Sequence, residues 1–245
     1  MGKVTTATAA AGSAAAPAQC PSCDTGWQLT PLAWERYLHS VVTMNEEHAK
    51  LCSSPEWAAC LQDEVLPALT LHADLGADML EIGPGPGGAT DWLRHRVKRL
   101  TAVEADAEAA GTLAARYRGG NVDVTAGSAT ELAYPDGSFD SVGSFTMLHH
   151  VPTQALQVRI LAEAFRVLRP GGVLIGSDSL ASNDLHHFHA DDTYNPVDPA
   201  ALLVRLQTLG FGKITMMVDW DLRFVAHKPD GQDACGDGPG PEAAA

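Results

Sequence analysis

Three absences limit what this chain can do. No run of apolar residues in the sequence approaches the length of about 20 that a membrane-spanning helix needs. Basic residues are scarce, because 16 Lys and Arg stand against 30 Asp and Glu and leave a formal net charge of −14. A charge of that sign repels nucleic-acid phosphates and anionic lipid surfaces. We therefore expect neither a nucleic-acid partner nor a membrane partner.

Closely spaced cysteines are also scarce. The 245 residues include 5 cysteines, and only Cys20 and Cys23 lie close together, with C-x-x-C spacing. Without a second pair, this spacing indicates neither a disulfide framework nor a zinc or redox site. The first 20 residues resemble a cleavable signal peptide only faintly, because their middle is Ala and Thr rather than strongly apolar. We expect a cytoplasmic protein with reduced thiols.

The composition divides the chain into a folded domain and two flexible ends. Residues 1–28 are rich in Ala, Thr and Ser, and residues 229–245 are rich in Gly and Pro, so neither end can bury an apolar core. We predict one domain over 29–228. Its first part, 29–74, is predicted to form N-terminal capping helices, and 75–228 is predicted to form the core.

Apolar runs typical of strands alternate with amphipathic helices along this domain. The predicted strands are 79–82, 100–103, 122–125, 139–145, 173–177, 213–218 and 222–226, and the predicted helices are 32–42, 57–69, 89–98, 106–117, 154–168 and 200–209. Strands separated by helices cannot pair as hairpins, so the first five should form a parallel sheet covered on both faces. The last two strands are close enough to pair antiparallel. The predicted fold class is α/β, a doubly wound and mostly parallel sheet.

A glycine-rich loop follows the first predicted strand. Gly83, Gly85 and Gly88 fit the pattern G-x-G-x-x-G between that strand and a helix. Glycines there allow a tight turn and a close backbone approach at the strand ends where ligands of open α/β sheets bind. Glu104, at the end of the second strand, can accept hydrogen bonds from both hydroxyls of a ribose. These residues predict a nucleotide-like cofactor, and both an NAD-dependent oxidoreductase and an S-adenosylmethionine-dependent methyltransferase fit them.

Glu81 helps to separate these two enzyme classes. It stands two positions before Gly83, at the end of the strand. A carboxylate there can orient the ammonium group of an amino-acid cofactor, whereas it would repel a pyrophosphate. The alternative is that Glu81 only fixes the conformation of the loop, and this alternative is compatible with either cofactor.

Four sequence segments together resemble the class I, seven-stranded S-adenosylmethionine-dependent methyltransferases. They are MLEIGPGPGG at 79–88, LTAVEAD at 100–106, AYPDGSFDSVGSFTMLHHVP at 133–152 and FRVLRPGGVLIGSD at 165–178. The Pro-Asp-Gly-Ser-Phe-Asp run and the Leu-Arg-Pro-Gly-Gly turn are far more specific than the glycine pattern. The resemblance covers most of 75–228 and implies a Rossmann-like sheet of seven strands with a C-terminal antiparallel strand. It also implies an enzyme whose cofactor is S-adenosylmethionine.

The resemblance assigns parts of the cofactor to particular residues. It places Glu81, Gly83, Gly85 and Gly87 around the methionine part of the cofactor and Glu104 on its ribose.

The adenine end of the cofactor is less well matched. Phe145 and Thr146, which follow the fourth strand, would lie beneath the cofactor. Relatives usually carry an acidic residue after the third strand that accepts from the adenine amino group, but this chain has Gly127 followed by Ser128 and Ala129. The Ser128 hydroxyl and the Ala129 amide are the groups left to contact the adenine edge.

Candidate catalytic residues follow the next two strands. Methyl transfer is an in-line displacement, so the enzyme must align the acceptor and, for a hydroxyl, remove its proton. His149 and His150 come directly after the fourth strand and Asp178 ends the fifth, an arrangement that resembles small-molecule O-methyltransferases. We predict that one histidine takes the proton while Asp178 orients it. A purely structural role for the histidines in shaping the cofactor pocket is the alternative.

A second group of histidines lies in the segment LHHFHADDTYNP at 185–196. Histidines and carboxylates this close together can bind a metal. Their spacing matches neither a helix face nor a strand face, so the sequence does not predict that they converge. We expect a substrate-facing loop and no metal.

The predicted function is methyl transfer to a small-molecule acceptor, a hydroxyl foremost, with nitrogen and carbon acceptors open. A non-catalytic S-adenosylmethionine-binding protein is a third possibility beside the oxidoreductase. Nothing in the sequence indicates an oligomeric state.

Overall fold

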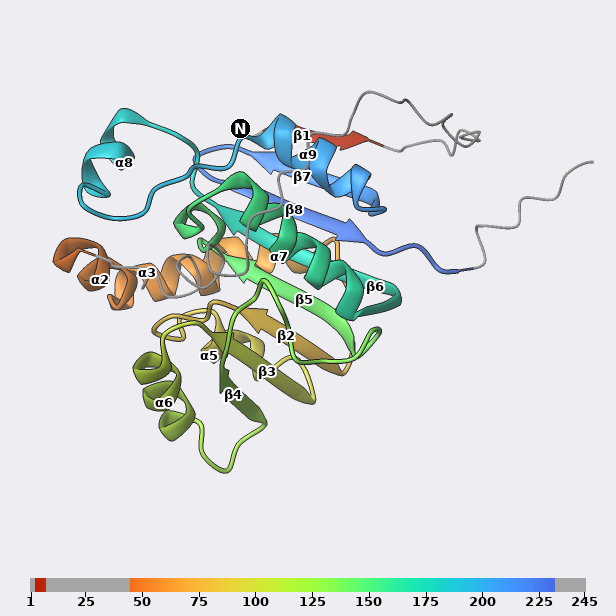
Figure 1. The fold of residues 1–245 in the computed structure, drawn as a ribbon, viewed down its shortest axis with the longest axis horizontal. Helices are drawn as coiled ribbons and strands as arrows, with labels where there is room; N and C mark the ends of the chain where they lie inside the picture. Colours follow the sequence, from red (N-terminus) through yellow and green to blue (C-terminus); the bar gives the residue numbers. More distant parts are fainter. Residues whose placement is uncertain (1–2, 8–44, 232–245) are drawn as a thin grey trace, which may run out of the picture.

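The computed structural model of the protein describes residues 3–7 and 45–231 (Figure 1). The predicted arm beyond residue 7, the predicted helix 32–42 and the predicted tail from 232 onward therefore lie outside the described residues, as does the C-x-x-C pair.

A mixed sheet forms the centre of the described domain. Its strands are β1 (Lys3–Ala7), β2 (Asp78–Ile82), β3 (Arg99–Glu104), β4 (Val122–Ala126), β5 (Phe139–Phe145), β6 (Leu168–Asp178), β7 (Gly212–Val218) and β8 (Leu222–His227). They lie in the order β1-β7-β8-β6-β5-β2-β3-β4. Strands β2 to β6 pair parallel, and β8 pairs antiparallel with both β6 and β7. This arrangement of β2 to β8 confirms the predicted seven-stranded, mostly parallel sheet with an antiparallel C-terminal strand.

Strand β1 corrects one prediction. The sequence predicts a flexible arm over residues 1–28, but Lys3–Ala7 pairs antiparallel with β7 and adds an eighth strand at the edge of the sheet. An edge strand needs only backbone partners from its neighbour, so it can form without the apolar residues that the composition argument required. The β-branched Val4, Thr5 and Thr6 also favour an extended backbone.

The helices are α2 (Glu46–Cys52), α3 (Pro55–Cys60), a π-helical turn η1 (Leu61–Val65), α4 (Leu66–Thr70), α5 (Thr90–Leu93), α6 (Ala107–Arg116), a 3₁₀ turn η2 (Leu148–His150), α7 (Gln154–Val167), α8 (Asn183–Phe188) and α9 (Pro199–Thr208). Side-chain caps fix several of their starts. The hydroxyl of Ser54 accepts a hydrogen bond from the Trp57 amide at 3.1 Å, and the carboxylate of Asp106 accepts one from the Ala109 amide at 2.8 Å. Such caps satisfy amides that the first turn leaves unpaired.

Three predicted segments differ from the structure. The predicted helix 57–69 is divided among α3, η1 and α4, and the predicted helix 89–98 ends at Leu93. The amides of Lys98 and Arg99 both donate to the Ala77 carbonyl oxygen at 3.0 Å, so the chain is already turning into β3 where the helix was expected to continue. In the expected loop 185–196, the first residues belong to α8, which Ser182 caps.

Apolar side chains pack on both faces of the sheet. On one face, Leu80 and Val142 share a buried cluster with Ile160 of α7 and Leu202 of α9. On the other face, the buried apolar residues of η1, α4, α5 and α6 pack against the strands, among them Leu66, Leu93 and Leu113. Because both faces are covered, the parallel strands can be apolar on both sides, as the doubly wound architecture requires.

The N-terminal helices α2 and α3 lie, with α8, at one end of the sheet. In Figure 1, α2, α3 and the α8 segment lie beyond the end toward which β2, β3 and β5 point. Ligands of open α/β sheets bind at this carboxyl end of the strands. None of the helices in the described part of the chain combines the length and the apolar character that crossing a bilayer requires.

Candidate functional site

The loop after β2 has the backbone conformation that its glycines allow. Gly83, Gly85 and Gly87 have φ angles of +66°, +52° and +89°, in the left-handed region that side chains with a Cβ rarely adopt. A Cβ on Gly83 would lie 2.4 Å from Cγ of Met147. Gly85 has open space where a Cβ would stand, whereas a Cβ on Gly87 would lie 2.8 Å from Leu113. Gly85 thus leaves room for a ligand beside the loop, Gly83 allows the Met147 side chain to pack against the loop, and Gly87 allows the loop to pack against α6.

The loop forms one wall of a cavity of about 550 Å³. Of the residues predicted to bind the cofactor, those that line it are Glu81, Gly83, Gly85, Glu104, Ser128, Ala129, Phe145 and Thr146. Gly87 does not line the cavity, and Gly88 does. Cys52, Trp57 and Leu61, from α2, α3 and η1, complete the cavity from the side of the cap helices. A cavity of this size and mixed lining is typical of a small-molecule site.

Glu81 is a buried carboxyl group on the cavity wall. Its exposed fraction is 1%, and the Thr90 hydroxyl donates to its Oε2 atom at 2.7 Å. Burial raises the pKa of Glu81 to about 7, and the hydrogen bond from Thr90 opposes that rise only in part. A buried carboxylate gains most from a cationic partner. The wall at Glu81 is therefore suited to an ammonium group.

Glu104 ends β3, the strand paired with β2, and contacts the glycine loop. Its Oε2 accepts from the Gly85 amide and its Oε1 from the Asp106 amide, each at 3.1 Å. These bonds hold the carboxylate in one orientation at the edge of the cavity. Each carboxylate oxygen has a further lone pair, so Glu104 can still accept from two hydroxyl groups.

The wall after β4 carries fewer polar groups. The Ser128 hydroxyl lies 2.7 Å from the Thr130 hydroxyl and accepts from the Thr130 amide at 3.2 Å. Ala129 lies beside it on the same wall. This part of the cavity offers one hydroxyl that already has a local partner.

The end of β5 is strained where it meets the cavity. Thr146 has a φ angle of +48°, and its amide donates to the Ser177 carbonyl oxygen at 2.8 Å. A left-handed conformation is unfavourable for a β-branched residue and persists only where its surroundings enforce it. The turn redirects the chain into η2, which carries His149 and His150.

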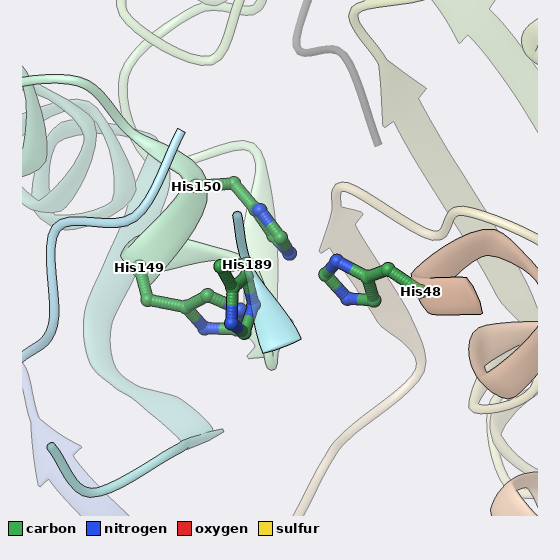
Figure 2. Close-up of side chains that lie close together, drawn as sticks. All are labelled: His48, His149, His150 and His189. Carbon is green, nitrogen blue, oxygen red and sulfur yellow. The ribbon is translucent and has the colours of Figure 1, made fainter. Parts of the chain in front are cut away.

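Histidines from three separate segments meet beside the cavity, and we call them the histidine cluster. Its members are His48, His149, His150 and His189. Figure 2 shows their rings gathered between η2, helix α2 and the end of α8. The ring centroids of His149 and His150 are 4.0 Å apart, and those of His48 and His189 are 4.6 Å apart. All four side chains are buried.

A carboxylate lies within hydrogen-bond distance of the Nδ1 atom of two of these rings. The Nδ1 atom of His149 lies 2.6 Å from Oδ1 of Asp178, at the end of β6. The Nδ1 atom of His48 lies 3.0 Å from Oδ2 of Asp192. Thus the structure places Asp178 against His149 and not against His150. Of the predicted catalytic residues, only His150 lines the cavity, while His149 and Asp178 lie behind it.

Protonation of the cluster is unfavourable at two of its members. Burial, and to a smaller extent the neighbouring histidines, lower the pKa of His150 to about 2. Burial also lowers the pKa of His189. At neutral pH these two imidazoles are neutral and present lone pairs.

Sequence reasoning did not find two members of the histidine cluster. His48 gave no signal, because nothing local marks a single histidine on a short helix that contacts residues 144 positions away. His189 was considered only with His186 and His187, which are exposed and lie outside the cluster. Only the packing of α2 and the α8 segment against η2 brings the cluster together.

The central part of the chain is similar to known methyltransferases. Residues 80–176 match the family model described as "Methyltransferase domain". The chain is 32% identical over 155 residues to a probable S-adenosylmethionine-dependent methyltransferase of Mycolicibacterium smegmatis, covering 60% of this chain and 57% of that one. It is 33% identical over 129 residues to phthiotriol/phenolphthiotriol dimycocerosates methyltransferase 1 of Mycobacterium ulcerans, covering 51% and 46%. The chain thus spans about half the length of these curated relatives.

Solved structures agree on the fold. A methyltransferase from Aquifex aeolicus described as SAM-dependent superposes with a TM-score of 0.57 at 17% sequence identity, over 76% of this chain and all of that one. At this identity the likeness concerns the fold alone, because one fold supports many functions.

Proposed function

We propose that residues 80–176, which match the family model described as "Methyltransferase domain", form the core of a class I S-adenosylmethionine-dependent methyltransferase domain, and that the protein transfers a methyl group from S-adenosylmethionine to a hydroxyl group of a small molecule. The observation that carries the proposal is the cavity itself. It has the glycine loop and Glu81 on one wall, Glu104 at its edge and His150 on the wall that β5 leads to.

The cofactor fits this cavity group by group. The ammonium of its methionine part pairs with the buried Glu81, and its ribose hydroxyls donate to Glu104, which the Gly85 amide holds in place. Phe145, Thr146, Ser128 and Ala129 also line the cavity. The first two would lie beneath the cofactor, and the last two would face its adenine. A dinucleotide fits less well, because its pyrophosphate would lie against the Glu81 carboxylate.

The acceptor end of the cavity lies at His150. In-line displacement at the sulfonium methyl group needs an aligned oxygen whose proton can leave. We assign the proton to the pair His149 and His150, with Asp178 as the positioning residue, since it fixes the Nδ1 atom of His149 at 2.6 Å. The Nε2 atom of His149 and the Nδ1 atom of His150 have no hydrogen-bond partner within residues 3–7 and 45–231. The name of one relative, the phthiotriol methyltransferase, also points to an alcohol acceptor.

Calorimetry and a labelling experiment test the proposal. We expect S-adenosylhomocysteine to bind the purified protein while NAD does not, and we expect isotopically labelled S-adenosylmethionine to mark a hydroxyl-bearing product in metabolite extracts. Binding of NAD but not of S-adenosylhomocysteine would contradict the proposal and favour an NAD-dependent oxidoreductase. Binding of S-adenosylhomocysteine without any labelled product would favour a non-catalytic cofactor-binding protein. Label on nitrogen or carbon would contradict the hydroxyl acceptor alone.

A further inference from the structure

The histidine cluster has the composition of a metal site. It brings together His48 of α2, His149 and His150 of η2, and His189 at the end of α8. One ring nitrogen from each lies within 4.8 Å of the others. Figure 2 shows the four rings close together. The exposed fractions of these four residues are 4%, 2%, 8% and 4%. Imidazole nitrogen is a preferred ligand of zinc, copper, nickel and iron.

Three of the rings are oriented as metal-bound histidines are. The Nδ1 atoms of His48 and His149 face the carboxylates of Asp192 and Asp178, at 3.0 and 2.6 Å. The Nδ1 atom of His189 lies 2.7 Å from the Leu185 carbonyl oxygen, which can only accept, so this nitrogen carries the proton. A neutral ring that donates from Nδ1 presents a lone pair at Nε2. Metal-bound histidines nearly always donate their other N–H to a carboxylate or a carbonyl in this way.

The lone pairs inside the cluster have nothing to bind within the described chain. The Nε2 atoms of His149 and His189 and the Nδ1 atom of His150 are buried and have no hydrogen-bond partner among the described residues. A buried acceptor without a partner costs free energy. A cation at the centre of the cluster would satisfy these nitrogens at once.

We propose that the histidine cluster binds one divalent transition-metal ion in a closed, four-coordinate site. Zinc–nitrogen bonds of about 2.0–2.1 Å in a tetrahedron separate the nitrogens by about 3.4 Å. The cluster, with separations of up to 4.8 Å, therefore closes by rotation of its side chains when the ion binds. Because all four ligands come from the protein, no position is left open, which is typical of structural rather than catalytic zinc sites.

Such an ion would link α2 and the end of α8 to η2 in the core of the domain. The start of α2 already contacts the end of α8, since the side chain of its N-cap residue Asn45 donates to the Phe188 carbonyl oxygen at 2.7 Å. The ion adds a direct link from both of these segments to η2, whose His150 lines the cavity. This site goes beyond the proposed function, because metal binding needs neither cofactor nor acceptor. An imidazole nitrogen that binds the ion cannot take a proton, so the histidine base of the proposed function belongs to the metal-free protein.

Metal titration of the full-length protein tests the site directly. After treatment with a chelator, the protein should bind one equivalent of Co²⁺, with the intense visible absorption of a four-coordinate ion, and Zn²⁺ should displace it. The wild-type spectrum requires no variant to fold. Binding of less than a stoichiometric amount, or the weak bands of six-coordinate Co²⁺, would overturn the proposal.

Substitutions then locate the ion. His189→Ala should weaken Zn²⁺ binding by more than about tenfold, because removal of only an outer partner of a ligand costs 10–100-fold. His187→Ala is the matched control, since this histidine lies two residues away on α8, is exposed and stands outside the cluster. A Cys20→Ser/Cys23→Ser variant tests the C-x-x-C pair as a competing ligand set. Wild-type affinity in His189→Ala, or loss of the ion in the double cysteine variant, would contradict the proposal. Calorimetry with S-adenosylhomocysteine on the same metal-free samples shows separately whether the methyltransferase function fails.

Discussion

The two sides of the cavity are built from very different stretches of sequence. The cofactor side comes from the loops after β2, β3 and β4, which follow one another along the chain. The histidine side joins α2, η2, the end of β6 and the segment after α8, so that His48 meets Asp192 across 144 positions. A side built from consecutive strand–loop units depends on local sequence, whereas the other side depends on how distant elements pack.

The two sides also differ in how well their polar groups are satisfied. On the cofactor side, Glu81 accepts from Thr90 and Glu104 accepts from two amides. On the histidine side, one nitrogen of His149 and one of His150 lack a hydrogen-bond partner in the part of the chain that the structure describes. Satisfied groups hold a ligand in place, while lone pairs without a partner can take a proton or a cation. We therefore expect changes on the cofactor side to alter affinity and changes on the histidine side to alter turnover.

The largest effect should come from the histidine side. In metal-free protein, His149→Ala or His150→Ala should lower the rate of methyl transfer by about 10² to 10⁴-fold, the usual contribution of a general base. The dissociation constant of S-adenosylhomocysteine should change less than about threefold, which is under 1 kcal/mol. Single-turnover kinetics and calorimetry measure the two quantities, and His187→Ala serves as the control.

The same variants test whether the two sides of the cavity have separate functions. If both single variants keep near-normal turnover, no histidine acts as the base, and alignment of the acceptor must account for the rate. If turnover falls only in proportion to lost cofactor affinity, the histidines shape the cofactor pocket, and the two sides of the cavity are not functionally separate.

Glu81 should give the cofactor side a pH dependence of its own. Burial raises its pKa to about 7, so in the free protein the carboxyl is largely protonated at pH 6. Only the ionised form pairs with the cofactor's ammonium. The affinity for S-adenosylhomocysteine should therefore rise with pH by up to about tenfold per unit and level off above the folded pKa. Calorimetry between pH 5 and 8 should show this slope in the wild type and a flat profile in Glu81→Gln.

Whereas cofactor affinity should rise with pH, the stability of the cofactor-free protein should fall as pH rises. The folded pKa of Glu81 lies above the ordinary value of 4.5, so its contribution to stability is complete below that value and is lost as pH rises through about 7. The loss amounts to roughly 3 kcal/mol. Glu81→Gln should thus stabilise the cofactor-free protein at pH 8 in denaturant titrations, while Asp123→Asn, an exposed carboxylate on β4, should not. Destabilisation by Glu81→Gln at pH 8 would contradict the assigned pKa.

Local sequence predicted most of the fold. Strand β5 begins and ends at the predicted residues, and the capping side chains of Asp106 and Ser54 stand at the starts of α6 and α3. These features depend on neighbours within a few positions, which the sequence displays directly. The division of the predicted helix 57–69 by η1 was not predicted, because a π-helical turn has no such local signature.

The candidate site was predictable only on one side. Eight of the nine residues expected to bind the cofactor line the cavity, and Gly87 instead faces Leu113. The pairing of Asp178 with His149 rather than His150 depends on the direction in which η2 turns after the strained Thr146. The approach of His48 depends on where α2 packs. Neither the turn nor the packing leaves a periodic pattern in the sequence.

Glu104 should give the next largest effect. Glu104→Ala removes charge-assisted hydrogen bonds to the ribose worth roughly 1.5–3 kcal/mol, so the dissociation constant of S-adenosylhomocysteine should rise at least about tenfold. Turnover at saturating cofactor should change much less. Asp123→Ala, at the exposed face of the neighbouring strand, controls for the lost charge. A rise below about threefold would reject the ribose contact.

Ser128 should give the smallest effect, because its hydroxyl already has a local partner in Thr130 at 2.7 Å. A neutral hydrogen bond contributes about 0.5–1.5 kcal/mol, so Ser128→Ala should weaken S-adenosylhomocysteine binding by about two- to tenfold. Ser138→Ala is a matched control, since that hydroxyl also has a local partner, the Pro135 carbonyl oxygen at 2.7 Å, and lies outside the cavity lining.

The analogue S-inosylhomocysteine, which lacks the adenine amino group, sharpens this test. If Ser128 accepts from the amino group, the wild type should prefer the adenine form and Ser128→Ala should lose part of that preference. Unchanged preference would leave the Ala129 amide as the contact to the adenine edge, because an alanine substitution at position 128 keeps the backbone in place. Loss of more than about a hundredfold in affinity would exceed what one neutral hydrogen bond supplies. Ser128 would then stabilise the whole wall after β4 through Thr130, and the cofactor side would depend on packing as the histidine side does.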